Sequence, residues 1–247
     1  MSGDTRVALF VTCLVDLFRP AIGFAAVDLL EQAGFKVEVP LNQTCCGQPN
    51  FNSGDRSATR TIARKIVDLF VAYDYVVIPS GSCGGMLKKH YPTLFDADDP
   101  MHEKAEQLSR KVYELSTFLV EKTNLRVEAG FDETVTYHDS CAGVREMGIR
   151  KQPRELLQQV DQLELREMND SDVCCGFGGT FCVKYPDISN NMLENKLRNI
   201  KESGADCVVG GDLGCILNIE GKLHRDGEDT PVYHYAELLV KRASRKE

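Results

Sequence analysis

The sequence predicts an α/β fold in which two related half-domains, each built on a parallel sheet, follow one another in a single chain. Two observations predict it. The cysteines recur in the same order in the two halves, and strand-like apolar runs alternate with helical patterns in both. Such alternation is typical of a parallel sheet covered by helices. We therefore expect half-domains at residues 1–126 and 127–247, related by approximate twofold symmetry.

The repeat is clearest in the cysteines. Eight of them form two matching sets: Cys13, Cys45, Cys46 and Cys83, then Cys141, Cys174, Cys175 and Cys215. Corresponding members are separated by 128, 129, 129 and 132 residues, and a glycine (Gly47 or Gly176) follows each adjacent pair. Near-constant offsets of this kind indicate an internal duplication.

The elements of the first half follow in order. An apolar run at 7–11 predicts a strand, and apolar residues at three- and four-residue spacing near 25–30 predict a helix. A second strand is expected at 36–39, a helix at about 57–70, a third strand at 75–78 and a closing helix from 112 to 120. The charged stretch 96–106 has no counterpart in the second half, and we interpret it as a surface insertion.

The second half repeats this scheme. Strands are expected at 135–138, 163–165 and 207–209, and helices around 156–160, at about 188–202 and from 232 to 240. All the repeated cysteines come just after a predicted strand. Because ligands collect beyond the carboxyl ends of parallel strands, the four cysteines of each half should converge on one point.

Composition limits the class of function. The chain has 247 residues, 43% hydrophobic and 27% charged, with a net charge of -8. This acidic balance disfavours binding to nucleic acid. The longest apolar runs, 7–15 and 75–87, are shorter than the roughly 18 residues of a membrane span, and no secretory signal opens the chain. We therefore expect a cytoplasmic protein, in which ten cysteines indicate metal binding or redox chemistry rather than disulfides.

The adjacent cysteines are poor candidates for disulfides, since neighbouring Cα atoms are only about 3.8 Å apart. Aiming both thiolates at one centre needs a sharp turn, which Gly47 and Gly176 permit. Four thiolates suit zinc or an iron–sulfur cluster. Zinc sites usually use short Cys-x2–4-Cys pairs, which neither set contains, so iron–sulfur is the preferred interpretation and zinc the alternative.

Several segments resemble a known family. They are 10–13, 45–49, 81–83, 174–181 and 215–219, and the resemblance covers essentially the whole chain. The twice-repeated Cys…Cys-Cys-Gly…Cys pattern is similar to the cysteine-rich domain of heterodisulfide reductases and of the iron–sulfur protein of glycolate oxidase. It most resembles the lactate-utilization protein A family.

The resemblance implies an electron-transfer subunit of an oxidoreductase complex that converts L-lactate to pyruvate. It implies two iron–sulfur clusters, of the [4Fe–4S] type, ligated by the eight repeated cysteines. It also implies two partners, a ferredoxin-like iron–sulfur subunit and a third lactate-utilization protein, with a flavin or other electron carrier on a partner. In related proteins a fifth cysteine lies three residues after the last one. Here Met86 and Asn218 occupy those positions, which leaves the cluster type open.

Two other functions stay open: a thiol–disulfide enzyme, and a zinc-stabilised scaffold without redox activity. No nicotinamide-binding G-x-G-x-x-G motif is present.

The remaining residues near the repeated cysteines receive mainly structural interpretations. Cys207 is expected in the core and Cys182 is favoured as a structural thiol over a substitute ligand. His138 is favoured as a satisfied structural group over a hydrogen-bond donor to sulfur or a proton carrier. Lys89 and Lys184 are favoured as solvated side chains over a binding site for a carboxylate substrate. Phe177 and Phe181 are expected to shield the second cluster.

Overall fold

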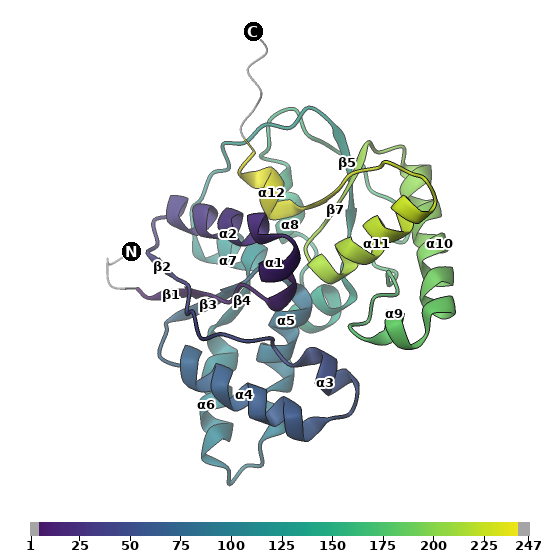
Figure 1. Ribbon diagram of the computed structural model, residues 1–247. Coiled ribbons are helices and arrows are strands. Elements are labelled where there is room, and N and C mark those ends of the chain that lie inside the picture. Colours follow the sequence, from purple (N-terminus) through teal and green to yellow (C-terminus); the bar gives the residue numbers. More distant parts are fainter. Residues whose placement is uncertain (1–4, 242–247) are drawn as a thin grey trace. The chain divides into compact units, whose positions relative to one another are not determined.

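The computed structural model describes residues 5–241, which divide into two compact units on either side of the boundary between Leu125 and Arg126. Each unit is built on its own four-stranded parallel sheet, and the two sheets have the same strand order (Figure 1). The α/β class and the duplication predicted from the sequence are therefore confirmed. Among the described residues, no helix combines the length and the apolar character needed to cross a membrane.

The first sheet has the order β2-β1-β3-β4. Its strands are β1 Val7–Leu9, β2 Val37–Glu38, β3 Tyr75–Ile78 and β4 Val112–Glu114. Its helices are α1 Cys13–Phe18, α2 Pro20–Gln32, α3 Gln48–Asn52, α4 Arg56–Phe70, α5 Gly81–Gly85, α6 Pro100–Lys111 and α7 Leu115–Lys122, with a π-helical turn η1 Met86–His90 and a 3₁₀ turn η2 Pro92–Leu94. Strands β1 and β3 are buried in the middle of this sheet.

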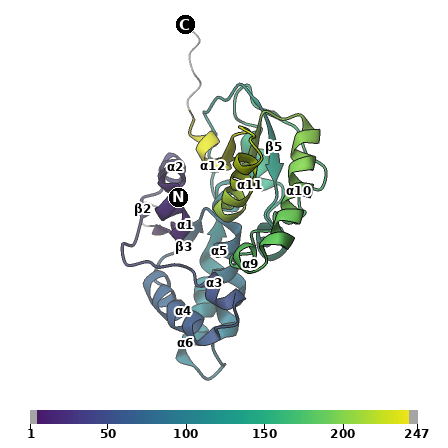
Figure 2. The same cartoon turned by 45° about the vertical axis from the view of Figure 1, so that its right-hand side comes forward.

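The second sheet has the order β6-β5-β7-β8. Its strands are β5 Thr134–His138, β6 Glu164–Leu165, β7 Cys207–Gly210 and β8 Val232–His234. Its helices are α8 Gln152–Leu157, α9 Phe181–Lys184, α10 Pro186–Ser203, α11 Leu213–Arg225 and α12 Tyr235–Leu239, with a π-helical turn η3 Gly143–Met147. Helices α10 and α11 pack against one another (Figure 2).

Helices α4 and α10 show how closely the second unit repeats the first. Each buries five side chains at three- and four-residue spacing, the stripe that an amphipathic helix turns toward a core. The same 130-residue offset separates every pair of buried positions, from Thr59 and Ser189 at one end to Phe70 and Ile200 at the other.

Two expectations about the elements were wrong. Residues 112–114 and 232–234, predicted to begin the closing helices, form the fourth strand of each sheet. Helices α7 and α12 begin at the residue after each strand because Glu114 and His234 cap them. The Glu114 carboxylate accepts the N–H of Ser116, and His234 Nδ1 accepts that of Ala236.

The stretch 96–106, predicted to be a surface insertion, contributes the first half of α6. Met101, Ala105 and Leu108 share one face of that helix and are buried, and α6 packs against α4 (Figure 2). The high charge of the segment belongs to the opposite face, so the segment is part of the first core rather than an addition to its surface.

Candidate metal centres

The four cysteines of the first set come together at the carboxyl end of the first sheet. Cys13 opens α1 just after β1, Cys45 and Cys46 lie in the loop between β2 and α3, and Cys83 lies in α5 just after β3. Their positions follow from the parallel topology, which brings the carboxyl ends of β1, β2 and β3 to the same edge.

Hydrogen bonds link these four thiols in a chain. Cys13 pairs with Cys45, Cys45 with Cys46, and Cys46 with Cys83. The bonds from Cys13 and Cys46 lower the pKa of the Cys45 thiol to about 2, while the pKa values of Cys13 and Cys46 are raised. Thiols this close together would release protons when a cation binds them as thiolates.

The second set repeats this arrangement. Cys141 pairs with Cys174, Cys174 with Cys175, and Cys175 with Cys215, which lies in α11. The bonds from Cys141 and Cys175 likewise lower the pKa of the Cys174 thiol to about 2. All ten cysteines of the chain are free thiols, so the structure groups eight of them in fours without forming any disulfide.

The glycine after each cysteine pair makes the turn that the sequence predicts. Gly47 has φ 80° and Gly176 has φ 83°, values in the left-handed region that favours glycine. Each glycine N–H donates to the sulfur of the first cysteine of its pair, Cys45 or Cys174, at 3.4 Å. Backbone donors to sulfur of this kind are one way in which proteins tune thiolate ligands.

The two residues that stand in place of a fifth cysteine have other roles. Met86 is fully buried in η1. Asn218 donates from Nδ2 to the carbonyl oxygen of Cys175 at 3.0 Å. In the first unit the equivalent carbonyl, that of Cys46, accepts instead from the hydroxyl of the buried Tyr91 at 2.9 Å. A side chain therefore donates a hydrogen bond to the second cysteine of each adjacent pair, but the donor is a tyrosine in the first unit and an asparagine in the second.

The two cysteines outside the sets behave differently. Cys207 begins β7 and is fully buried, as expected, and burial raises the pKa of its thiol to about 12. Cys182 lies in α9 and is half-buried, and its N–H donates to the Phe177 carbonyl.

His138 departs from its expected role. It ends β5 with 1% of its surface exposed, and neither ring nitrogen has a hydrogen-bond partner among residues 5–241. Burial and the nearby Lys196 ammonium lower the pKa of this imidazole to about 4, against the opposing effect of Asp139 and Cys174, so it is neutral near pH 7. The expectation of a satisfied structural histidine was wrong, because the side chain faces Cys175 and Cys215 rather than a polar partner.

Two basic side chains in the second unit were missed in the sequence. Lys196 is fully buried on the core face of α10 and donates to the carbonyls of Asp170 and Ser171, at 2.6 and 3.2 Å. Arg154 clamps the buried Asp139 with two hydrogen bonds of 2.9 Å each. The signal for Lys196 was available: it interrupts the apolar stripe of a helix, at the position that Ile66 occupies in α4.

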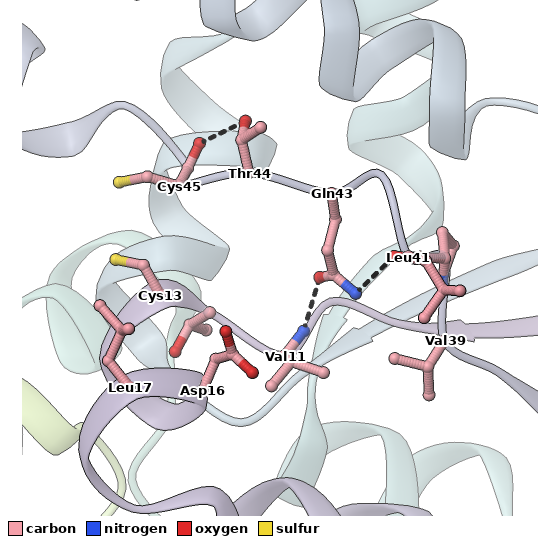
Figure 3. A pocket seen from close by; sticks show the side chains of 11 residues that line it. Val11, Cys13, Asp16, Leu17, Val39, Leu41, Gln43, Thr44 and Cys45 are labelled. Atoms are coloured by element: carbon pink, nitrogen blue, oxygen red, sulfur yellow. Dashed lines mark hydrogen bonds between the residues drawn. The ribbon is translucent and has the colours of Figure 1, made fainter.

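A cavity of 290 Å³ opens beside the first set (Figure 3). The side chains of Cys13 and Cys45 lie at its wall and point to the same side, and Leu17, Val39 and Leu41 add apolar surface. Gln43 fixes the loop by accepting from the Val11 N–H at 2.9 Å and donating to the Pro40 carbonyl at 3.0 Å.

The aromatic and basic residues singled out in the sequence are placed as follows. The ring of Phe177 lies against Gly214, where an added Cβ would be 2.4 Å from it, and so next to Cys215. Phe181 packs on Tyr185 at 5.4 Å between ring centroids. Lys89 and Lys184 are exposed.

Comparison with known proteins adds to this geometry. The profile of a family described as "Cysteine-rich domain" matches residues 7–88 and again 135–220, one match in each unit. The chain is 43% identical to Lactate utilization protein A of Halalkalibacterium halodurans over 95% of this chain and 96% of the relative. It is 46% identical to the protein of that name from Shouchella clausii, over 95% and 98% of the two chains.

A solved structure resembles the fold. The crystal structure of a hypothetical protein from Helicobacter pylori matches with a TM-score of 0.68 at 14% identity, over 98% of this chain. The match spans 50% of that longer chain, and at this identity it shows the shared fold alone.

Proposed function

This chain belongs to the lactate utilization protein A family, and from that premise we propose that it is the iron–sulfur electron-transfer subunit of a complex that oxidises L-lactate to pyruvate. The observation that carries the proposal is the convergence of eight free thiols into two groups of four, one in each unit. Residues 1–126 and 127–247 would then act as two half-domains, each with a centre of its own.

The donor set fits such a group. Thiolate sulfur suits zinc and iron–sulfur clusters, and the buried His138 has two nitrogens whose partners the protein does not supply among its described residues. Iron–sulfur is favoured over zinc because the four thiols of each set come from three separate segments of the chain, with no short Cys-x2–4-Cys pair. We propose two clusters of the [4Fe–4S] type, ligated by Cys13, Cys45, Cys46 and Cys83 and by Cys141, Cys174, Cys175 and Cys215.

The proposed link to lactate comes from the relatives, which are named Lactate utilization protein A. Oxidation of L-lactate to pyruvate releases two electrons and two protons, which other groups must accept. When bound, an iron–sulfur cluster supplies one-electron transfer at its site. The chain's own residues would hold that group, cover it and donate hydrogen bonds to its thiolates, as Gly47 and Gly176 do to Cys45 and Cys174.

An electron-transfer subunit needs partners. We propose a ferredoxin-like iron–sulfur subunit and a third lactate-utilization protein, with a flavin or other electron carrier on a partner, in the cytoplasm. Exposed apolar side chains next to the first thiol group support a protein partner: Leu17 is 71% exposed and Leu41 is 96% exposed, and both line the cavity beside Cys13.

A thiol–disulfide enzyme is the second candidate. The observation that favours it is the lowered pKa of Cys45 and Cys174, which are half-buried rather than sealed in the core. A zinc-stabilised scaffold is the third, because the donor atoms alone suit zinc as well.

The test is metal and sulfide analysis of full-length protein purified without oxygen, with an EPR spectrum. Iron and acid-labile sulfide at cluster stoichiometry in both units supports the proposal. Zinc without sulfide selects the scaffold, and metal-free protein that reduces a disulfide with an electron donor selects the thiol–disulfide enzyme.

Variants then assign the ligands. Cys46→Ser and Cys175→Ser should each remove about half of the iron and leave the other unit loaded. Cys207→Val is the matched control, since Cys207 is buried but lies outside both sets. Full iron content in both serine variants would refute the ligand assignment.

A further inference from the structure

His138 is the polar group that the fold leaves without a partner beside the second thiol group. One of its ring nitrogens and the sulfurs of Cys175 and Cys215 lie within 4.8 Å of one another. The side chain is 1% exposed, and neither ring nitrogen makes a hydrogen bond within residues 5–241. Burying an imidazole without partners is unfavourable, and native proteins satisfy nearly all such groups. The two nitrogens are therefore open to a partner that the described residues do not supply.

The first unit shows that the fold does not itself require a histidine here. Strand register aligns Leu9 with Val77 in the first sheet and Tyr137 with Val209 in the second, so the next residues, Phe10 and His138, are equivalent. Phe10 is fully buried and packs on Phe70 at 5.6 Å between ring centroids. The same place in the same fold is filled by an apolar ring in one unit and by a nitrogen donor in the other.

The position of the imidazole matches that of a ligand. A tetrahedral metal bound at about 2.3 Å from sulfur and about 2.0 Å from nitrogen holds those atoms roughly 3.5 Å apart. That separation lies within the 4.8 Å limit found for His138, Cys175 and Cys215. The imidazole is therefore close enough to share a metal with both thiols while being hydrogen-bonded to neither.

We propose that His138 ligates the metal of the second centre through one imidazole nitrogen. This centre then has five protein ligands, the four cysteines and His138, whereas the first has four cysteines and carries the apolar Phe10 at the equivalent strand position. The inference rests on the proposed function only in requiring that the second thiol group hold a metal, either iron or zinc.

The test looks for imidazole nitrogen at the metal in full-length protein. For iron-loaded protein the measurement is electron spin echo envelope modulation of the paramagnetic clusters, with ¹⁵N-histidine labelling to identify the coupled nitrogen. For zinc-loaded protein it is zinc X-ray absorption, in which imidazole gives a distinct backscattering pattern. Histidine coupling is expected at one of the two centres.

Three variants complete the design. His138→Phe copies the first unit and should abolish the histidine signal. His138→Cys offers a thiolate at the same place and should retain the metal without the nitrogen signal, which keeps the test valid if the phenylalanine variant folds poorly. His224→Gln removes an exposed histidine of α11 and should leave the signal unchanged.

The outcomes separate the two proposals. Loaded protein without histidine coupling, or coupling that persists in His138→Phe, would overturn the role of His138, leave the proposed function standing and assign the imidazole to a buried water. Protein in which neither thiol group takes up iron or zinc would overturn both.

Discussion

Replacing Gly176 by alanine tests how the turn after the second cysteine pair is held. An added Cβ would lie 2.8 Å from the Ser189 carbonyl oxygen and 3.2 Å from its Cα, both of them backbone atoms of α10. The residue also has φ 83°. The left-handed backbone alone costs an L-residue about 1–2 kcal/mol. Displacing a packed helix adds a term of about 1–3 kcal/mol, as overpacking does elsewhere.

Two glycines of the first unit separate these terms. Gly54 has φ 82° and nothing within 4 Å of an added Cβ, so Gly54→Ala measures the backbone term alone. Gly47 has φ 80° and its nearest neighbour is an Ile62 side-chain atom at 3.5 Å, an ordinary van der Waals contact. We therefore expect losses of about 1–2 kcal/mol for Gly54→Ala and Gly47→Ala and about 2–5 kcal/mol for Gly176→Ala.

The assay must report on each unit separately. Hydrogen exchange of the amides of β5 and β7, compared with those of β1 and β3, gives the free energy of opening for each sheet. Gly176→Ala should lower protection in the second sheet and leave the first unchanged. Equal losses for Gly176→Ala and Gly54→Ala would refute the claim that contact with α10 fixes the second turn.

Three further predictions concern the buried groups of the second unit. Arg154→Ala should cost about 3–5 kcal/mol of stability because it strands a buried carboxylate, whereas Arg150→Ala, which breaks an exposed ion pair, should cost under about 1 kcal/mol; similar losses in urea unfolding would contradict this. Lys196→Met should raise hydrogen exchange in residues 170–175, since two carbonyls lose their donor, while Lys65→Met on the exposed face of α4 should not; unchanged exchange would show that the amine does not hold this loop. Burial raises the pKa of Cys207 to about 12, so the folded state keeps a proton that the unfolded state loses above about pH 8.5, and stability should fall with rising pH by up to about 1.4 kcal/mol per unit. Cys207→Val should remove that part of the slope between about pH 8.5 and 10, and an identical slope in both proteins would be incompatible with the raised pKa.

The elements that sequence patterns located well are those with strong local signals. Strands β1, β3, β5 and β7 are apolar runs, and α4 and α10 have a clear stripe of buried positions. Strands β4 and β8 were missed because each has only three residues and runs directly into a helix. Their extended conformation depends on pairing with β3 and β7, which no local pattern encodes.

The sequence by itself determined the class of the fold, its duplication and the two sets of cysteines, because these depend on local periodicity and on spacing along the chain. The tertiary structure alone decided which groups share the space around those cysteines. His138 takes the place of Phe10 in its sheet, and Lys196 takes the place of Ile66 in its helix. Only the packed fold shows that His138 and Lys196 both lie near the second thiol group. The reason is physical: burial and the proximity of residues dozens of positions apart arise from how the strands and helices pack, and so does the difference between the two centres.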